Sequence, residues 1–243
     1  MNGYKTSTEL KANARGILIG NYGRVVPAQL MYILFVYFVD MLNGGIMTGG
    51  NFSFLRSAIA FGIAFIAAVF TELLKFGLCR FYMNVCCNFP ASVGDLFRGF
   101  RFADDRPARI GVLLVSRMIF YLCPSFAVFA LYAITNNHYL LPLASLVAVV
   151  GMVFYYIFRL NMSQCYYLLL DFPEKDANEI VRLSKWLMQG QKMRLFYLQV
   201  SLIPIILLSI IPCGIGLLWA MPYANTSFAC FHLNLTAQAA AKA

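Results

Sequence analysis

Residues 140–165 read LLPLASLVAVVGMVFYYIFRLNMSQC, and Arg159 is the one charged residue in this stretch. A helix needs about 20 consecutive apolar residues to cross the roughly 30 Å hydrocarbon core of a bilayer. Backbone groups cannot pair with water inside hydrocarbon, and a helix satisfies them all within its own segment. The stretch therefore predicts a membrane-spanning helix.

The composition of the whole chain extends this prediction. Of its 243 residues, 61% are hydrophobic and only 12% are charged, whereas soluble domains carry about 25% charged residues. Polar side chains are too few to cover a surface that faces water on all sides. We therefore expect lipid to surround much of the protein.

Five further segments have the length and apolar character of a span. They are residues 25–42, 57–79, 110–133, 195–212 and 214–231. The predicted fold class is thus all-α, a polytopic membrane protein with six transmembrane helices. The last two segments meet at a break formed by Ile211, Pro212, Cys213 and Gly214. A single bent span there is the alternative, and it would place the C-terminus on the other side of the membrane.

The positions of the basic residues predict how these spans are oriented. Residues 43–55 and 134–139, which join spans one to two and three to four, carry no charge. Basic residues instead gather in the N-terminal segment and in the connections at the other ends of the spans. Because Lys and Arg concentrate in cytoplasmic loops, we expect both termini in the cytoplasm and the protein in the cytoplasmic membrane of a bacterial-type cell.

The net charge of +9 bears on the expected partners. Such a charge indicates nucleic-acid binding when a soluble basic domain carries it. Here the basic residues flank apolar spans, so we expect no nucleic acid and instead expect membrane phospholipids, above all anionic ones. A membrane-protein partner or a homo-oligomer is a further expectation.

Short basic segments, each opening with an acidic residue, recur along the chain. They begin at Glu9, Asp95 and Glu179, with starts about 85 residues apart, and such self-similarity at a fixed period indicates a repeat. Each precedes two spans, which predicts three parallel repeats of an amphipathic inner-surface helix plus a transmembrane hairpin. The approximate units within a single membrane domain, 1–243, are 5–88, 89–172 and 173–235, with a tail at 236–243. Chance similarity between basic inner loops is the alternative.

The basic side chains of these segments, together with one tryptophan, are candidates for contact with lipid head groups. A basic amphipathic helix lies in the membrane interface, with its apolar face toward the acyl chains. The candidates are Lys11, Arg15, Arg98, Arg101, Arg182, Lys185 and Trp186.

Several motifs are similar to those of a known bacterial family. They are LKANAR at 10–15, GNYG at 20–23, RLSKWLMQG at 182–190, GIGLLW at 214–219 and PY at 222–223. Together they resemble the domain-of-unknown-function family 975, a group of integral membrane proteins found mainly in Gram-positive bacteria. The resemblance covers nearly the whole chain and implies a six-span protein of the Gram-positive plasma membrane. It implies no established activity.

Polar and charged residues at membrane depth are the candidate functional residues. A charge at the centre of a spanning helix costs at least ~2.5 kcal/mol on insertion scales, so such groups pair, face a wet cavity or reach the interface. The candidates for an anion-binding pocket in the inner leaflet are Glu72, Lys75, Arg117, Arg159, Asn161 and Gln164. The alternative is a structural ion pair of Glu72 with Arg117 or Arg159 that ties spans together.

The sequence contains no motif for catalysis or metal binding. Its two histidines, His138 and His232, are far apart in the chain, and the patterns H-E-x-x-H, G-x-S-x-G and G-K-[ST] are absent. We expect a non-enzymatic protein, without catalytic residues, metal or cofactor, that binds anionic lipid or organises membrane components at the inner leaflet. The alternative is a small transporter or exporter of an anionic or amphipathic solute. A lipid-modifying enzyme would need a second acid or a histidine near Glu72.

Overall fold

The computed structural model describes residues 4–48, 54–100, 104–135, 138–211 and 214–241, and these residues form helices and no strand. The elements are α1 (Ser7–Leu18), α2 (Tyr22–Thr48), α3 (Phe54–Cys86), the 3-10 helix η1 (Val93–Phe100), α4 (Arg106–Thr135), α5 (Leu140–Met162), α6 (Cys165–Asp171), α7 (Ala177–Leu187), α8 (Lys192–Ile210) and α9 (Leu217–Ala240). The predicted all-α class is confirmed for the described part of the chain.

The first helix shows how local sequence sets its ends. The backbone N–H of Glu9 donates to Thr6 Oγ1 (3.3 Å), and the N–H of Thr6 donates to Glu9 Oε2 (2.8 Å). This capping box satisfies backbone donors that the first turn leaves free. After the helix, Gly20 has a φ of 88°, a left-handed conformation that glycine adopts without steric cost. The chain therefore turns there into α2.

One face of α1 is part of the protein core. The residues buried along it are Leu10, Ala14 and Leu18. A spacing of four residues places them on one side of the helix, and this side packs against α9. The basic residues of α1 are left on its other faces.

Five of the described helical segments are long and apolar enough to cross a membrane. They are Tyr22–Leu42, Phe61–Cys86, Arg106–Val128, Leu140–Asp171 and Lys192–Ile210. These segments correspond to the first five predicted spans and indicate a membrane protein. The predicted span 214–231 falls mainly in α9, which is not among the five. Its apolar sequence is interrupted by Asn225, Thr226, Ser227 and His232.

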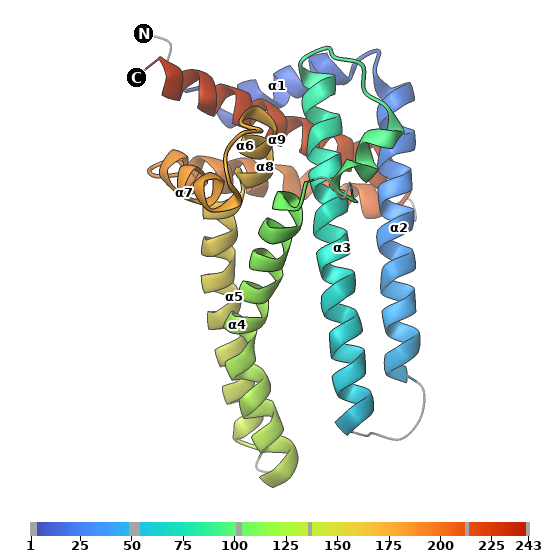
Figure 1. Ribbon diagram of the computed structural model, residues 1–243, viewed down its shortest axis with the longest axis vertical. Helices are drawn as coiled ribbons and strands as arrows, with labels where there is room; N and C mark the ends of the chain where they lie inside the picture. The colour runs from blue at the N-terminus through green and yellow to red at the C-terminus, as the bar shows by residue number, and fades with distance from the viewer. Residues whose placement is uncertain (1–3, 49–53, 101–103, 136–137, 212–213, 242–243) are drawn as a thin grey trace.

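The long helices and the chain ends have a simple arrangement. Helices α2 to α5 run along the long axis of the molecule, and α9 runs across it near one end (Figure 1). Both termini lie at that end, where the Lys5 N–H donates to Asn234 Oδ1 (3.2 Å). The last turns of α2 and α4 lie toward the opposite end.

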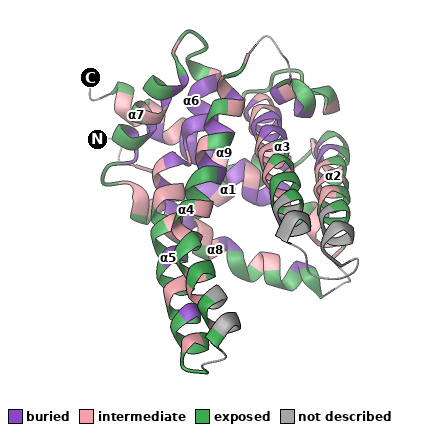
Figure 2. Ribbon diagram, turned by 60° about the horizontal axis from the view of Figure 1, so that its bottom comes forward, coloured by how far each residue is buried: buried purple, intermediate pink, exposed green. Residues whose placement is uncertain are grey.

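Burial is concentrated around α9. Its buried residues run from Ala220 to Leu235, and Figure 2 shows buried residues gathered near α6, α9 and the adjoining part of α3, with exposed residues along α4 and α5. The exposed side chains of α5 include Leu146, Val149 and Phe154. Large apolar side chains exposed along a helix need a partner other than water, and this exposure is consistent with a membrane protein.

Two glycines allow η1 to lie directly on α3. A Cβ at Gly77 would collide with the carbonyl oxygen of Leu96, and a Cβ at Gly99 would collide with the carbonyl oxygen of Leu73. Asp95, which is buried, adds an ion pair to Arg80 of α3 at 3.6 Å. The second basic segment is therefore held against the same turns of α3 that carry Glu72 and Lys75.

A salt-bridged arginine joins the start of α4 to the connection between α6 and α7. Arg106 donates to both carboxylate oxygens of Asp104, at 2.7 and 2.8 Å. The same guanidinium donates to the backbone carbonyls of Pro173 and Lys175. A planar guanidinium can hold a carboxylate through two bonds and still have donors left. This link orients the ends of α4 and α6 relative to each other.

Candidate functional site

A cavity of about 610 Å³ is enclosed by helices α2–α6, α8 and α9. This volume is within the range of roughly 300–1,000 Å³ that small-molecule sites occupy. Its polar lining includes Gln29, Glu72, Lys75, Arg159, Gln164, Gln199 and Asn225. Its apolar and aromatic lining includes Tyr32, Leu78, Leu114, Tyr155, Leu160, Leu195, Met221 and Phe228. The cavity thus combines a few polar groups with a largely apolar wall.

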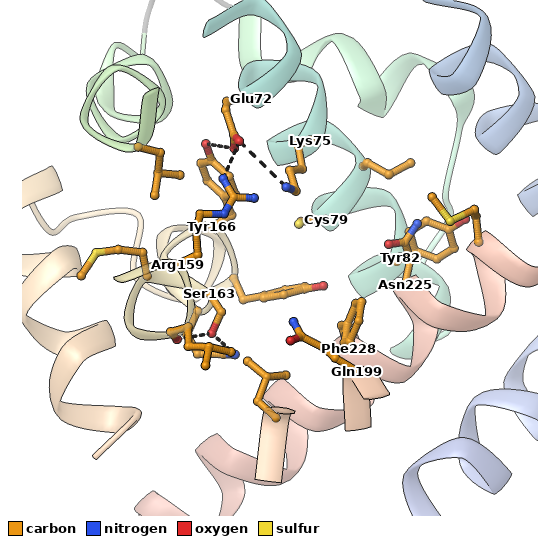
Figure 3. A pocket seen from close by; sticks show the side chains of 18 of the residues that line it. Glu72, Lys75, Cys79, Tyr82, Arg159, Ser163, Tyr166, Gln199, Asn225 and Phe228 are labelled. Carbon is orange, nitrogen blue, oxygen red and sulfur yellow. Dashed lines mark hydrogen bonds and ion pairs between the residues drawn. The ribbon is translucent and has the colours of Figure 1, made fainter. Parts of the chain in front are cut away.

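Glu72 is the centre of the charged groups in this cavity (Figure 3). Arg159 Nη1 donates to Glu72 Oε1 at 2.6 Å, and Tyr166 Oη donates to Oε2 at 3.0 Å. Lys75 Nζ lies 3.9 Å from Oε1. Lys75 is on the same face of α3 as Glu72 because residues three apart are neighbours on a helix. Two cations therefore share one carboxylate, which leaves one positive charge in excess.

Exposure distinguishes the three charged side chains. Lys75 keeps 39% of its side-chain surface exposed, against 27% for Arg159 and 13% for Glu72. Its contact with Glu72, at 3.9 Å, is longer than a hydrogen bond, whereas Arg159 makes a short charge-assisted one. The ammonium group of Lys75 is therefore the cation that a ligand in the cavity can reach.

A group of amide and hydroxyl side chains forms another part of the wall. Tyr82 Oη donates to Gln29 Oε1 at 2.8 Å, and Asn225 Nδ2 donates to the same oxygen at 3.2 Å. Gln29 is fully buried, and its Nε2 has no hydrogen-bond partner among the described residues. A buried donor without a partner costs about 1–3 kcal/mol. This amide therefore lacks an acceptor within the part of the chain that the structure describes.

His232 lies behind the cavity wall in a buried polar cluster. Its Nδ1 is 2.9 Å from Gln164 Oε1, and its Nε2 is 2.8 Å from Asp171 Oδ2. The ring stacks on Tyr167 with centroids 5.0 Å apart. Gln164 and Tyr167 line the cavity, and His232 does not. Sequence reasoning missed this cluster, because its members come from α5–α6 and α9 and no local spacing connects them.

Comparison with protein families identifies what the chain is related to. The profile of one family, described as protein of unknown function (DUF975), matches residues 1–239. The chain belongs to the DUF975 family. The family assignment expected from the sequence motifs is thereby confirmed. Searches of the curated proteins and of the solved structures found no match for this DUF975 chain.

Four of the six predicted pocket residues of the DUF975 chain line the cavity: Glu72, Lys75, Arg159 and Gln164. Of the two ion pairs that the sequence left open for Glu72, the one with Arg159 is present.

The other two predicted pocket residues do not line the cavity. Arg117 is exposed, and its guanidinium carbon lies 5.9 Å from the ring centroid of Phe120. Asn161 Nδ2 donates to the carbonyl of Ile157 (3.1 Å), and the Asn161 carbonyl accepts from Ser184 Oγ (2.7 Å). Arg117 is therefore directed to the outer surface, and Asn161 joins α5 to α7.

The residues predicted to contact lipid head groups lie mostly on the surface of this DUF975 protein. Those that are exposed are Arg15, Arg98, Arg182, Lys185 and Trp186, and Lys11 is half-buried. Arg101 lies outside the described residues. Trp186, at 59% exposed, is beside Lys185 at the end of α7. Such an aromatic and basic pair is typical of a helix at a membrane interface.

Proposed function

We propose that this protein is a non-enzymatic component of the cytoplasmic membrane that binds an anionic lipid in the cavity beside α3. The observation that carries the proposal is Lys75. It is a cation within a predicted span, it faces a cavity, and its one ion pair among the described residues is long. Ionisable groups inside spanning helices are costly and usually serve a function. An anionic head group would supply the missing counter-charge.

The remainder of the cavity suits the apolar part of a lipid. Its wall includes Leu78, Leu114, Leu195, Met221 and Phe228. An acyl chain packed against these side chains gains free energy by leaving water, at about 0.8 kcal/mol for each buried CH₂ group. A small soluble anion would gain no free energy from contact with these apolar side chains. The combination of one accessible cation with an apolar enclosure therefore favours an amphiphile.

The proposal includes the orientation expected from the sequence. Six spans, as the sequence predicts, would form three parallel units, each with an inner-surface segment: α1, η1 and α7. Both termini would be cytoplasmic, together with the exposed Arg182, Lys185 and Trp186. Each basic residue near an anionic leaflet contributes about 1 kcal/mol of attraction. Surface segments of this kind would hold the cavity at the level of the lipid head groups.

Lipid retained by the purified protein tests the proposal. We expect Lys75→Met to retain about tenfold less anionic phospholipid than the wild type in native mass spectrometry, because a loss of one direct ion pair is worth at least 1 kcal/mol in a partly buried site. Arg117→Met is the matched control, since it removes a cation at membrane depth that lies outside the cavity. Equal retention by the wild type and Lys75→Met would overturn the proposal.

A transporter of an anionic amphiphile is the second candidate. The cavity favours it, because it lies among spanning helices and carries polar groups at membrane depth, as transporter sites do. Flux of a labelled anionic lipid or fatty acid across proteoliposomes would distinguish the two. Binding without flux supports the first proposal, and flux that Lys75→Met abolishes supports the second.

A further inference from the structure

We infer that the cavity selects an amphiphile whose head group carries a single negative charge, a phosphodiester or a carboxylate. We also infer that Glu72 competes with this head group for the ammonium group of Lys75. The inference rests on the proposed function and names the ligand class and the control of that site. It follows from the way in which the three charges and the neighbouring amides are arranged.

The first step concerns the pairing of Glu72 and Arg159. Arg159 donates to Oε1 at 2.6 Å and Tyr166 donates to Oε2 at 3.0 Å. Both carboxylate oxygens thus have a close donor, and the Glu72–Arg159 pair is neutral as a unit. The charge that remains to be balanced is that of Lys75 alone. A ligand with one negative charge balances it, and a second negative charge has no counter-ion among the described lining residues.

The second step concerns the distance between Lys75 and Glu72. At 3.9 Å, the two groups attract each other electrostatically but do not form a hydrogen bond. An anion that binds Lys75 replaces this weak contact and comes close to the Glu72 carboxylate. The two like charges repel each other. For a dianion this repulsion and the attraction to Lys75 both double, whereas the cost of taking the ligand charge out of water rises more steeply than either. Glu72 therefore weakens the binding of every anionic ligand, and a dianion also has to bury a second charge that no cation in the cavity balances.

The third step concerns neutral donors. Gln29 and Asn225 line the same cavity as Lys75, and Figure 3 shows Asn225 and Tyr82 across from Arg159 and Tyr166. Gln29 is fully buried, whereas Asn225 is half-buried and keeps accessible surface. Amide N–H groups bind oxygen acceptors without adding charge. The Asn225 amide therefore suits an uncharged oxygen of a phosphodiester or the second oxygen of a carboxylate, and it leaves the charge balance unchanged.

Lipids with the same acyl chains and head groups of different net charge test the inference on the wild type. The probes are phosphatidylcholine, phosphatidylglycerol and phosphatidic acid with the same two acyl chains, compared in nanodisc or native mass-spectrometry competition at pH 8. A phosphate monoester is mostly a dianion at this pH, since its second pKa is about 6. We expect phosphatidylglycerol to bind about tenfold more tightly than phosphatidylcholine and at least as tightly as phosphatidic acid. Tighter binding of phosphatidic acid than of phosphatidylglycerol would overturn the inference.

Two further probes identify the source of the head group. A long-chain fatty acid carries the carboxylate on an apolar chain, and inorganic phosphate carries the charge without a chain. We expect the fatty acid to compete with phosphatidylglycerol and inorganic phosphate to compete poorly. If inorganic phosphate competes as well as the fatty acid, the site recognises a free anion and the inference is wrong.

The variant Glu72→Gln tests the competitor role. It keeps the shape and one acceptor oxygen, which can face Arg159, while its amide N–H can donate to Tyr166 Oη. It raises the excess charge in the cavity from one to two. We expect phosphatidylglycerol to bind about tenfold more tightly, and phosphatidic acid to become the preferred lipid. Unchanged affinities in a folded Glu72→Gln protein would overturn the inference. If this variant does not fold, the head-group series on the wild type decides alone.

The two proposals fail in different ways. If the wild type binds phosphatidylglycerol no more tightly than phosphatidylcholine, the proposed function itself is wrong. If Lys75→Met loses phosphatidylglycerol while the wild type prefers phosphatidic acid, lipid binding stands and the selection for a single charge is wrong.

Discussion

The two glycines of α3 show where a neighbouring element approaches this helix closely and where none does. Gly77 lies two residues after Lys75 on α3, and the backbone of Leu96 in η1 occupies the space that a Cβ would need. Gly62 lies on the same helix, and a Cβ there would meet open space. The two glycines of α3 thus have opposite roles, one as a contact surface and the other as a plain helical residue.

We expect Gly77→Ala to destabilise the protein by about 1–3 kcal/mol, because the added methyl must displace the backbone of η1. Gly62→Ala is the control on the same helix. It should leave stability unchanged or raise it by up to about 1 kcal/mol, since alanine is the better helix former. Thermal unfolding midpoints in the same detergent check both. A Gly77→Ala protein as stable as Gly62→Ala would show that η1 does not lie on α3 as described.

A polar contact at the start of α4 links this helix to the connection between α6 and α7. Arg106 at the start of α4 joins Asp104 to the backbone of the α6–α7 connection. Because Arg106 donates hydrogen bonds to it, the Asp104 carboxyl has a pKa below its ordinary value. A carboxyl group with a lowered folded-state pKa stabilises the protein above its unfolded pKa, and this contribution is lost as pH falls through the folded value.

We therefore expect the wild type to lose thermal stability as the pH falls below about 4, where an unfolded Asp takes up its proton, and Asp104→Asn to lose less over the same window. The difference should be small, since Asp104 is 33% exposed and solvent screens the pair. Glu174→Gln, an exposed acid in the same connection, is the control. Parallel pH profiles for the wild type and Asp104→Asn would contradict the assigned link.

The protein in its entirety has two ends of different character. The termini and α7 lie toward one end, and the last turns of α2 and α4 lie toward the other (Figure 1). Exposed cationic side chains, among them Arg182 and Lys185, belong to the first end. The proposed orientation places this end in the cytoplasm.

Cysteine labelling of intact cells checks this orientation. In a chain whose Cys87, Cys123 and Cys213 are replaced by Ser, we expect a membrane-impermeant maleimide to react with Tyr139→Cys from outside. Gln189→Cys should react only after the membrane is permeabilised. Labelling of Gln189→Cys in intact cells would reverse or disprove the topology, and with it the position of the cavity in the inner leaflet.

Much of the architecture can be predicted by reading along the chain. Apolar runs such as 140–165 predict spanning helices, because a helix is the way for a single segment to satisfy its backbone in hydrocarbon. The capping box that starts α1 is likewise local, because its partners Thr6 and Glu9 are three residues apart in the chain. The family motifs are equally local. These features depend on neighbouring residues alone, so no knowledge of packing is needed.

Which polar groups meet was decided by the tertiary structure. Arg117 and Arg159 are alike in sequence, each a cation within an apolar run, yet Arg159 pairs with Glu72 from 87 residues away and Arg117 faces outward. Gln29 and His232 showed no sequence signal, but α2, α3, α6 and α9 bring them into buried networks. Apolar composition gives the depth of a residue in the membrane. The rotation of each helix about its own axis, set by packing against its neighbours, decides what that residue faces.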